Sequence, residues 1–200
     1  LLTVGSIVCH SKPGDTLWGS GIHTGSDAGG WRAHDKTFLA VRGPHTRKFV
    51  MGRGGKCPEV YGDPALLLPT IHPVALSPIR ELAIMPHLDD DAGWNFGHSR
   101  GVYTINTGWP WERVITEICN SAHVVSSSLH GVIIAEAYGV PVTWASSIKR
   151  PGKFEDYFAG VSRTPSQCLP WSKAVEQQPI TLQQSAPPNL LPALLEKYRG

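Results

Sequence analysis

A histidine stands where a predicted strand passes, through three serines, into a predicted helix. The segment HVVSSSLHGVIIAEAYGVP covers residues 123–141, with an apolar strand expected over 123–125 and a helix over 129–138. Small residues at such a turn let a ligand approach backbone N–H groups, and the helix dipole adds a positive potential. His130, in the first helical turn, could donate a hydrogen bond to an anion or transfer a proton. The pattern predicts a phosphate or carboxylate site, although serines that only cap the helix and a locally packed His130 would also fit it.

A basic stretch earlier in the chain offers a second contact for an anion. Seven Lys or Arg residues and one acid lie between Arg32 and Lys56, although the net charge of the 200-residue chain is only +2. Arg42 ends a predicted strand over 37–41, where its guanidinium could grip a phosphate or carboxylate with two hydrogen bonds. A surface ion pair is the alternative for Arg42. The small net charge argues against a nucleic-acid or membrane polyelectrolyte.

Strands and helices alternate along most of the chain, which is typical of parallel sheets with helical crossovers. Strands are expected over 1–9, 37–41, 81–85, 101–106, 123–125, 140–144 and 180–183, and helices over 45–52, 110–120, 129–138 and 188–198. Ligands of such folds bind beyond the carboxyl ends of the strands. A proline-rich stretch between Pro69 and Pro78 indicates a linker, which would divide the chain into domains over 1–78 and 79–200.

Six short motifs, in this order, resemble those of the polysaccharide pyruvyl transferase family. They are Trp18-Gly19-Ser20-Gly21, Val41-Arg42-Gly43-Pro44, Tyr61-Gly62-Asp63-Pro64-Ala65, Met85-Pro86-His87, the Leu129-His130-Gly131 helix start, and Lys153-Phe154-Glu155-Asp156-Tyr157. Two features depart from the family's pattern. The family often has Arg directly before Leu-His-Gly, where this chain has Ser128, and its longer N-terminal part with a Gly-Asp turn is not found here.

The resemblance implies a transferase that moves the pyruvate unit of phosphoenolpyruvate onto two hydroxyls of a sugar, forming a ketal. The sugar would belong to a cell-surface polysaccharide or its lipid-linked precursor. The implied fold is α/β, with Rossmann-like parallel sheets in a GT-B-like two-domain arrangement whose N-terminal half is shortened. His130 would be the catalytic acid and Arg42 would grip the donor. The other expected substrate contacts are Gly19, Ser20, His87, Ser128, Leu129, Gly131 and Lys153.

Several of these residues also have a purely structural explanation. Gly19 and Ser20 could shape a turn without lining the ligand site, and Lys153 could belong to a solvated charge cluster with its acidic neighbours. The run from His87 to Asp91 contains three adjacent aspartates, but a metal site there is disfavoured because adjacent side chains point in different directions. His87 is more simply explained as a residue that lines the cleft.

The expected partners are phosphoenolpyruvate and a sugar or glycolipid acceptor, with no further cofactor, no metal and no nucleic acid. Cationic side chains and N–H groups would neutralise the charge of the reaction. The four widely spaced cysteines fit a reducing cytosol, and the enzyme is expected in the cytoplasm or at the inner face of the membrane. Two other functions stay open: a nucleotide-sugar glycosyltransferase of GT-B type and a non-catalytic anion- or glycan-binding domain.

Overall fold

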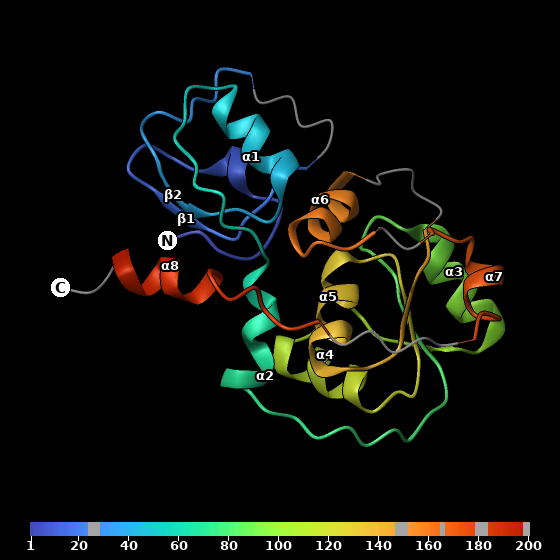
Figure 1. Cartoon of the computed structure of the whole chain (residues 1–200). Helices are drawn as coiled ribbons and strands as arrows, with labels where there is room; N and C mark the ends of the chain where they lie inside the picture. The colour runs from blue at the N-terminus through green and yellow to red at the C-terminus, as the bar shows by residue number, and fades with distance from the viewer. Residues whose placement is uncertain (24–28, 147–151, 165–166, 179–183, 198–200) are drawn as a thin grey trace. The chain divides into compact units, whose positions relative to one another are not determined.

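The chain folds into parallel sheets whose strands alternate with helices, which confirms the predicted α/β, Rossmann-like class (Figure 1). The structure is a computed structural model, and it describes residues 1–23, 29–146, 152–164, 167–178 and 184–197. The strand expected over 180–183 lies outside the described residues.

Two compact units share the chain. The first comprises Leu1–Pro64, Arg150–Pro165 and Ala186–Gly200, and the second comprises Ala65–Lys149 and Ser166–Ser185. The two continuous domains over 1–78 and 79–200, and their GT-B-like arrangement, stay predictions.

A two-stranded parallel sheet forms the centre of the first unit. Its strands are β1 (Thr16–Trp18) and β2 (Thr37–Ala40), and isolated bridges extend it by pairing Leu2 with Leu17 and Val41 with Tyr61. The prediction of a strand over 1–9 is wrong. The chain turns at Gly5, whose φ of 118° lies in the region that favours glycine, and Val8–His10 then form a 3-10 helix.

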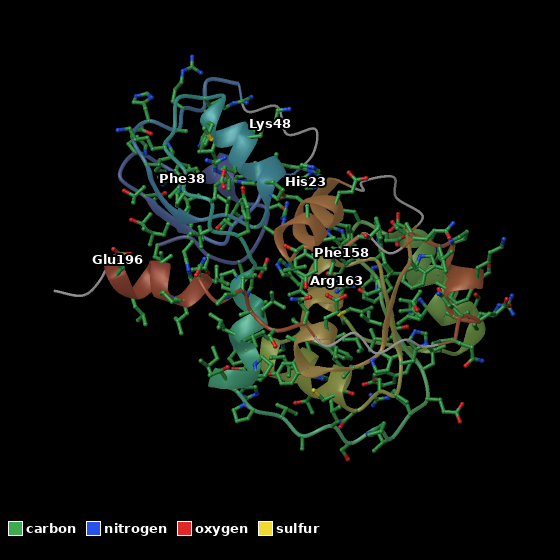
Figure 2. The ribbon with its side chains drawn as sticks, in the orientation of Figure 1. His23, Phe38, Lys48, Phe158, Arg163 and Glu196 are labelled. Carbon is green, nitrogen blue, oxygen red and sulfur yellow. The ribbon has the colours of Figure 1, made fainter. Side chains whose placement is uncertain are left out.

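Among the described residues of the first unit there are three α-helices: α1 (Pro44–Met51), α6 (Gly152–Gly160) and α8 (Leu190–Lys197). The first and last confirm the helices expected over 45–52 and 188–198, whereas α6 was not expected. The Trp18 indole N–H donates to the Leu190 carbonyl over 2.6 Å and ties α8 to β1. Figure 2 labels Phe158 near the end of α6 and Arg163 beyond it, whose guanidinium carbon lies 5.0 Å from the Phe158 ring centroid.

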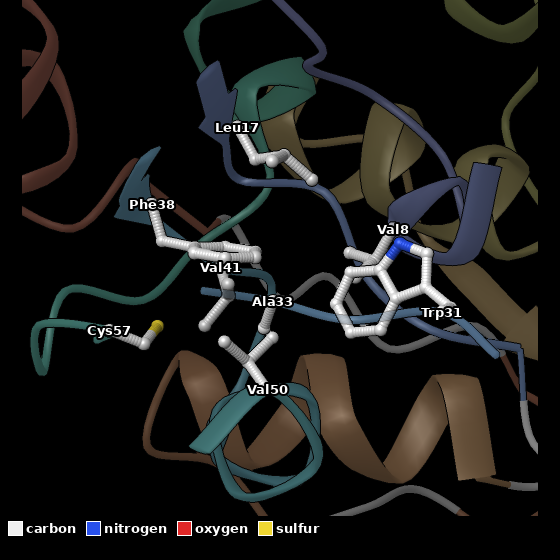
Figure 3. Close-up of a cluster of buried hydrophobic side chains, with 8 residues drawn as sticks. All are labelled: Val8, Leu17, Trp31, Ala33, Phe38, Val41, Val50 and Cys57. Atoms are coloured by element: carbon white, nitrogen blue, oxygen red, sulfur yellow. The ribbon is translucent and has the colours of Figure 1, made fainter. Parts of the chain in front are cut away.

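The core of the first unit joins the sheet to α1 (Figure 3). Its buried side chains are those of Val8, Leu17, Trp31, Ala33, Phe38, Val41, Val50 and Cys57. Val50 is buried in this core and Phe49 packs against it, which holds α1 against the sheet. Burial raises the pKa of the Cys57 thiol to about 11, so this cysteine stays protonated at neutral pH.

The second unit contains a four-stranded parallel sheet in the order β4-β3-β5-β6. The strands are β3 (Ala83–Met85), β4 (Tyr103–Thr104), β5 (Val124–Ser126) and β6 (Val142–Trp144), which confirms the four strands predicted here. Ala83 faces both Tyr103 and Val124 in neighbouring strands. The three residues of β3 are buried, as are those of β5, so these two strands form the inside of the sheet.

Helical crossovers connect these strands. They are α3 (Asp91–Arg100), α4 (Trp111–Cys119) and α5 (Leu129–Tyr138), and the short helices α2 (Leu68–Ile71) and α7 (Trp171–Ala174) pack in the same unit. The helices predicted over 110–120 and 129–138 are confirmed. Almost every side chain of α5 is buried, and the helix ends at Gly139, whose φ of 75° closes it with a left-handed cap.

In the described part of the chain, no helix is long and apolar enough to cross a membrane. All four cysteines are free thiols, and no group of three or more His, Cys, Asp and Glu side chains among the described residues is placed to hold a metal ion.

A buried histidine makes the stability of the second unit depend on pH. His123 lies directly before β5, and its Nε2 is 2.9 Å from the Thr143 hydroxyl. Burial lowers the pKa of His123 from its ordinary 6.5, so the unfolded chain binds the proton first as the pH falls. The stabilisation is therefore complete above about pH 6.5 and is lost as the pH falls below that value. We expect chemical denaturation to show this loss in the wild type and not in His123→Gln; equal pH slopes would contradict it.

Candidate functional site

The order of strands in the second unit reverses between β3 and β5, so a ligand crevice is expected at the carboxyl ends of these two strands. The chain passes from β3 to its neighbour β4 on one side and then returns to β5 on the other. In open parallel sheets, this reversal is where ligands bind. His87 follows β3 and Ser127 follows β5, and the His87 backbone N–H donates to the Ser127 hydroxyl over 2.9 Å. Two predicted segments, Met85-Pro86-His87 and the serine turn, are therefore adjacent at this reversal.

The serine turn is fastened to the neighbouring strand. The Ser126 hydroxyl donates to the Met85 carbonyl over 2.8 Å and accepts the Ser128 backbone N–H over 3.0 Å. Ser128 is the N-cap residue of α5, but its side chain makes no capping hydrogen bond. The serines therefore fix the position of the turn against β3 more than they cap the helix.

The first turn of α5 directs its N–H groups toward the end of the helix. Val132 N–H is bonded to the Ser128 carbonyl over 3.2 Å, while helices leave the N–H groups of the preceding positions without partners inside the helix. Leu129 and Gly131 are buried on either side of His130, which is half-buried. His130 is therefore the side chain of this turn that reaches the surface, at the positive end of the helix dipole.

Gly131 has a packing reason to be glycine. A Cβ at this position would lie 2.3 Å from the Ser126 hydroxyl and 2.9 Å from the Met85 sulfur. The glycine lets α5 approach the ends of β5 and β3. Its predicted role in ligand approach, like those of the buried Ser128 and Leu129, stays a prediction.

His87 is held in place by hydrogen bonds to its backbone and to its ring. Its carbonyl accepts the Trp94 indole N–H over 3.1 Å, and its Nδ1 accepts the Asp89 backbone N–H over 3.2 Å. A backbone N–H can only donate, so Nδ1 is the acceptor and the neutral ring carries its proton on Nε2. The side chain is 30% exposed. His87 is therefore a partly exposed residue of the turn after β3, and its ring contacts the neighbouring Asp89.

The run of three aspartates has a structural explanation. Asp90 is the N-cap of α3, where its carboxylate accepts the Gly93 N–H over 3.2 Å and the Trp171 indole N–H over 3.1 Å. The carboxylate is buried, and a Cβ on Gly93 would lie 2.6 Å from the Trp171 ring. Asp90 thus starts α3 and holds α7 against it.

In the first unit, Arg42 is the centre of a buried ionic network. Its side chain is 1% exposed, and its Nη2 lies 3.1 Å from Asp156 Oδ2. Nε donates to the same oxygen over 3.2 Å, Nη1 donates to the Ser6 hydroxyl over 2.9 Å, and Nη2 donates to the Ile22 carbonyl over 2.8 Å. Burial lowers the pKa of Arg42, and the Asp156 charge opposes this change. Direct contact between Arg42 and a donor anion stays a prediction, and it would require displacement of these partners.

Asp156 also serves as the cap of α1. The N-cap residue Gly43 has no side chain, and Asp156 Oδ1 accepts the backbone N–H groups of His45 over 2.9 Å and Thr46 over 3.1 Å. The Thr46 hydroxyl donates to Asp156 Oδ2 over 2.6 Å. A carboxylate from α6 therefore satisfies the helix end that the local sequence leaves open.

Three glycines surround this network, two of them from predicted motifs and the third, Gly160, at the end of α6. A Cβ on Gly43 would lie 1.8 Å from the Asp156 carbonyl oxygen, and one on Gly21 would lie 2.2 Å from the Arg42 guanidinium carbon. A Cβ on Gly160 would lie 2.1 Å from the Arg42 carbonyl oxygen. Motifs far apart in the sequence are thus parts of one packed structure, and the role of Asp156 in it was missed. The Lys-Phe-Glu-Asp-Tyr motif contains two acids, Glu155 and Asp156, and the sequence does not show which of them is buried.

The remaining predicted contacts of the first unit are also built into its packing. Gly19 has a φ of 80°, and a Cβ there would lie 2.3 Å from Pro64. Ser20 is fully buried and its hydroxyl donates to the Thr3 carbonyl. Lys153 is on α6, three residues before Asp156, with a largely buried side chain. Contacts of these residues with a substrate stay predictions.

Comparison with known proteins identifies one family. The family model described as Polysaccharide pyruvyl transferase matches residues 16–147. No curated protein and no solved structure matches the chain significantly. The matched residues include β1, β2 and α1 of the first unit, and the whole β3-to-β6 sheet with its strand reversal in the second.

Proposed function

The chain belongs to the polysaccharide pyruvyl transferase family, and from this premise we propose that it uses phosphoenolpyruvate to form a pyruvate ketal on two hydroxyls of a sugar. The acceptor sugar belongs to a cell-surface polysaccharide or to its lipid-linked precursor. The proposal places the enzyme in the cytoplasm or at the inner face of the membrane, where both substrates are accessible.

One observation carries the proposal within the structure: the N-terminal end of α5 follows β5 at the strand reversal, with the half-buried His130 in its first turn and His87 bonded to Ser127. Phosphoenolpyruvate carries a phosphate and a carboxylate, both of which suit a helix N-terminus. The Nε2–H of His87 supplies a further donor to one of these groups. Ser128 occupies the position where the family often has Arg. The neutral donor of His87 would therefore offset part of the contact that this Arg supplies in the family.

His130 is the proposed acid. It gives a proton to the methylene carbon of phosphoenolpyruvate, whose double-bond electrons form the new C–H bond and leave positive charge on the carbon that bears the carboxylate. A sugar hydroxyl attacks that carbon and gives its proton to His130, which restores the acid. The bond from the same carbon to the phosphate oxygen then breaks, and phosphate leaves with the electron pair. The second hydroxyl attacks the carbon, passes its proton to the departing phosphate and closes the ketal.

Lys153 is the proposed cationic contact of the first unit, in support of the donor's negative charge. Arg42 could take this role only if the donor displaced Asp156, Ser6 or Ile22 from its guanidinium. Arg42 then contributes by stabilising the fold of the first unit.

Incubation of the protein with phosphoenolpyruvate and a panel of candidate glycans tests the function. We expect phosphate release that depends on the acceptor, together with a new ketal methyl signal in the NMR spectrum of the glycan. A reaction without acceptor is the control for simple hydrolysis. Turnover of a nucleotide sugar without any ketal would assign the chain to glycosyl transfer instead and overturn the proposal.

A further inference from the structure

The N-terminal end of α1 has the parts of an anion-binding site. Two backbone N–H groups, of His45 and Thr46, point to one place, and the Thr46 hydroxyl and the Arg42 guanidinium point to the same place. All of these donors are occupied by a single group, the carboxylate of Asp156, which is fully buried. A carboxylate accepts at both oxygens, and a helix N-terminus and a guanidinium both favour its charge.

We infer that Asp156 is a built-in carboxylate ligand of this site, and that it is a positioning residue which fixes α6 and thereby Lys153. The second part rests on the proposed function, because it assigns Lys153 to the donor. The first part concerns the fold of the first unit alone and holds whatever the enzyme's substrate is.

The geometry explains why the ligand must come from α6. Residues 114 positions apart in the sequence meet in the Arg42–Asp156 pair, and α1 packs directly against α6. The α6 backbone also approaches closely, since a Cβ on Gly43 would overlap the Asp156 carbonyl oxygen. A glycine at position 160 lets the other end of α6 lie on the Arg42 backbone. Arg42, just before α1, thus forms an ion pair with Asp156 in the middle of α6, within a tightly packed contact.

Lys153 depends on this anchor through the geometry of a helix. Residues three apart lie on neighbouring positions of one helix face, so a shift of Asp156 moves Lys153 with it. Phe154 and Tyr157 of the same helix are buried beside them and would transmit such a shift. Loss of the Asp156 charge should therefore affect the same kinetic constant as loss of Lys153.

Asp156→Ala with added formate tests the carboxylate site. The substitution leaves Arg42 buried without its counter-charge, and we expect the folding equilibrium constant to fall about 100-fold or more. The truncation also leaves a space of carboxylate size. Sodium formate at about 100 mM should then raise the melting temperature of the variant at least about 2 °C above its value in sodium chloride, with no such difference for the wild type. Equal melting temperatures in both salts would overturn the inference.

If Asp156→Ala does not fold in chloride, its refolding yield from urea is compared in formate and in chloride, and equal yields count against the site. A second variant tests the charge itself. Asp156→Asn keeps the shape of the side chain but places an amide among donors, so we expect it to be destabilised as well. Wild-type stability of Asp156→Asn would show that the charge is not needed.

The positioning role is read from kinetics, with phosphoenolpyruvate as the varied substrate. Asp156→Asn and Lys153→Met should change the same constant, KM or kcat, and the double variant should be no worse than Lys153→Met alone. Additive losses would overturn the positioning role. If the wild type forms no ketal at all, the proposed function fails, but the formate measurement still decides the carboxylate site.

Discussion

Replacing His130 with alanine is expected to lower kcat for ketal formation about 10²- to 10⁴-fold, the usual contribution of a general acid. The residue stands half-buried in the first turn of α5, at the carboxyl end of β5. Its neighbours Leu129 and Gly131 are buried, so the substitution removes a surface group and leaves the turn in place. The backbone N–H groups of the helix end remain, and binding of phosphoenolpyruvate should therefore persist in the variant.

Steady-state kinetics and direct binding of phosphoenolpyruvate measure the two effects separately. His98→Ala is the matched control, because His98 is an exposed histidine on α3 of the same unit. It should retain wild-type kcat. A His130→Ala variant with wild-type turnover would show that His130 is not the acid, and would favour a binding function for this end of α5.

Replacing Arg42 with alanine is expected to lower the free energy of unfolding by about 3–5 kcal/mol, because it leaves a buried carboxylate without its partner. Arg42 and Asp156 are each 1% exposed at the side chain. The Ser6 hydroxyl and the Ile22 carbonyl lose hydrogen bonds in the same step. The effect is larger than that of a typical substitution because four contacts depend on one side chain.

Lys48→Ala is the control for this measurement. Lys48 is exposed on α1, so its removal changes the net charge equally but leaves the buried network intact. Its effect should stay within about 0.5 kcal/mol. Urea denaturation of the three proteins makes the comparison. An Arg42→Ala variant as stable as Lys48→Ala would contradict the structural role. Arg42 would then again be a candidate contact of the donor substrate.

The second unit could be predicted well because its signals are local. The helix over 129–138 was expected with the bounds that the structure has, since an apolar run begins after three serines and stops at a glycine. The neighbouring strands were found for the same reason. Their carboxyl ends were expected to carry the site, and the sheet order now shows that β3 and β5 flank the reversal.

Helix α3 was missed because its sequence gives weak local signals. It contains Gly93 and Gly97, which lower helix propensity, and it follows a run of aspartates that resembles a loop. Both glycines are used in packing: a Cβ on Gly93 would meet Trp171, and one on Gly97 would meet the Thr104 hydroxyl. The cap by Asp90 and the contact with Trp171 compensate for the poor propensity, and the second of these comes from a distant segment.

The network around Arg42 could not be predicted for a related reason. The sequence placed Arg42 at the end of a strand with glycine beside it, which is also the pattern of a ligand site. In the structure Arg42 meets the buried carboxylate of Asp156, which comes from a helix 114 positions away. No local pattern predicts such a pairing, although the six motifs in order already indicated that distant segments belong together.

Transfer of a labelled carbon in heavy water tests the central claim most directly. Phosphoenolpyruvate labelled with carbon-13 at its methylene carbon is incubated with the enzyme and a pyruvylatable glycan in D₂O, and the product is read by NMR. The account predicts that the label enters the glycan as a ketal methyl group that carries one deuterium, because the enzyme protonates the methylene carbon from solvent-exchanged His130. Label found only in phosphoenolpyruvate or free pyruvate, with none in the glycan, would contradict it.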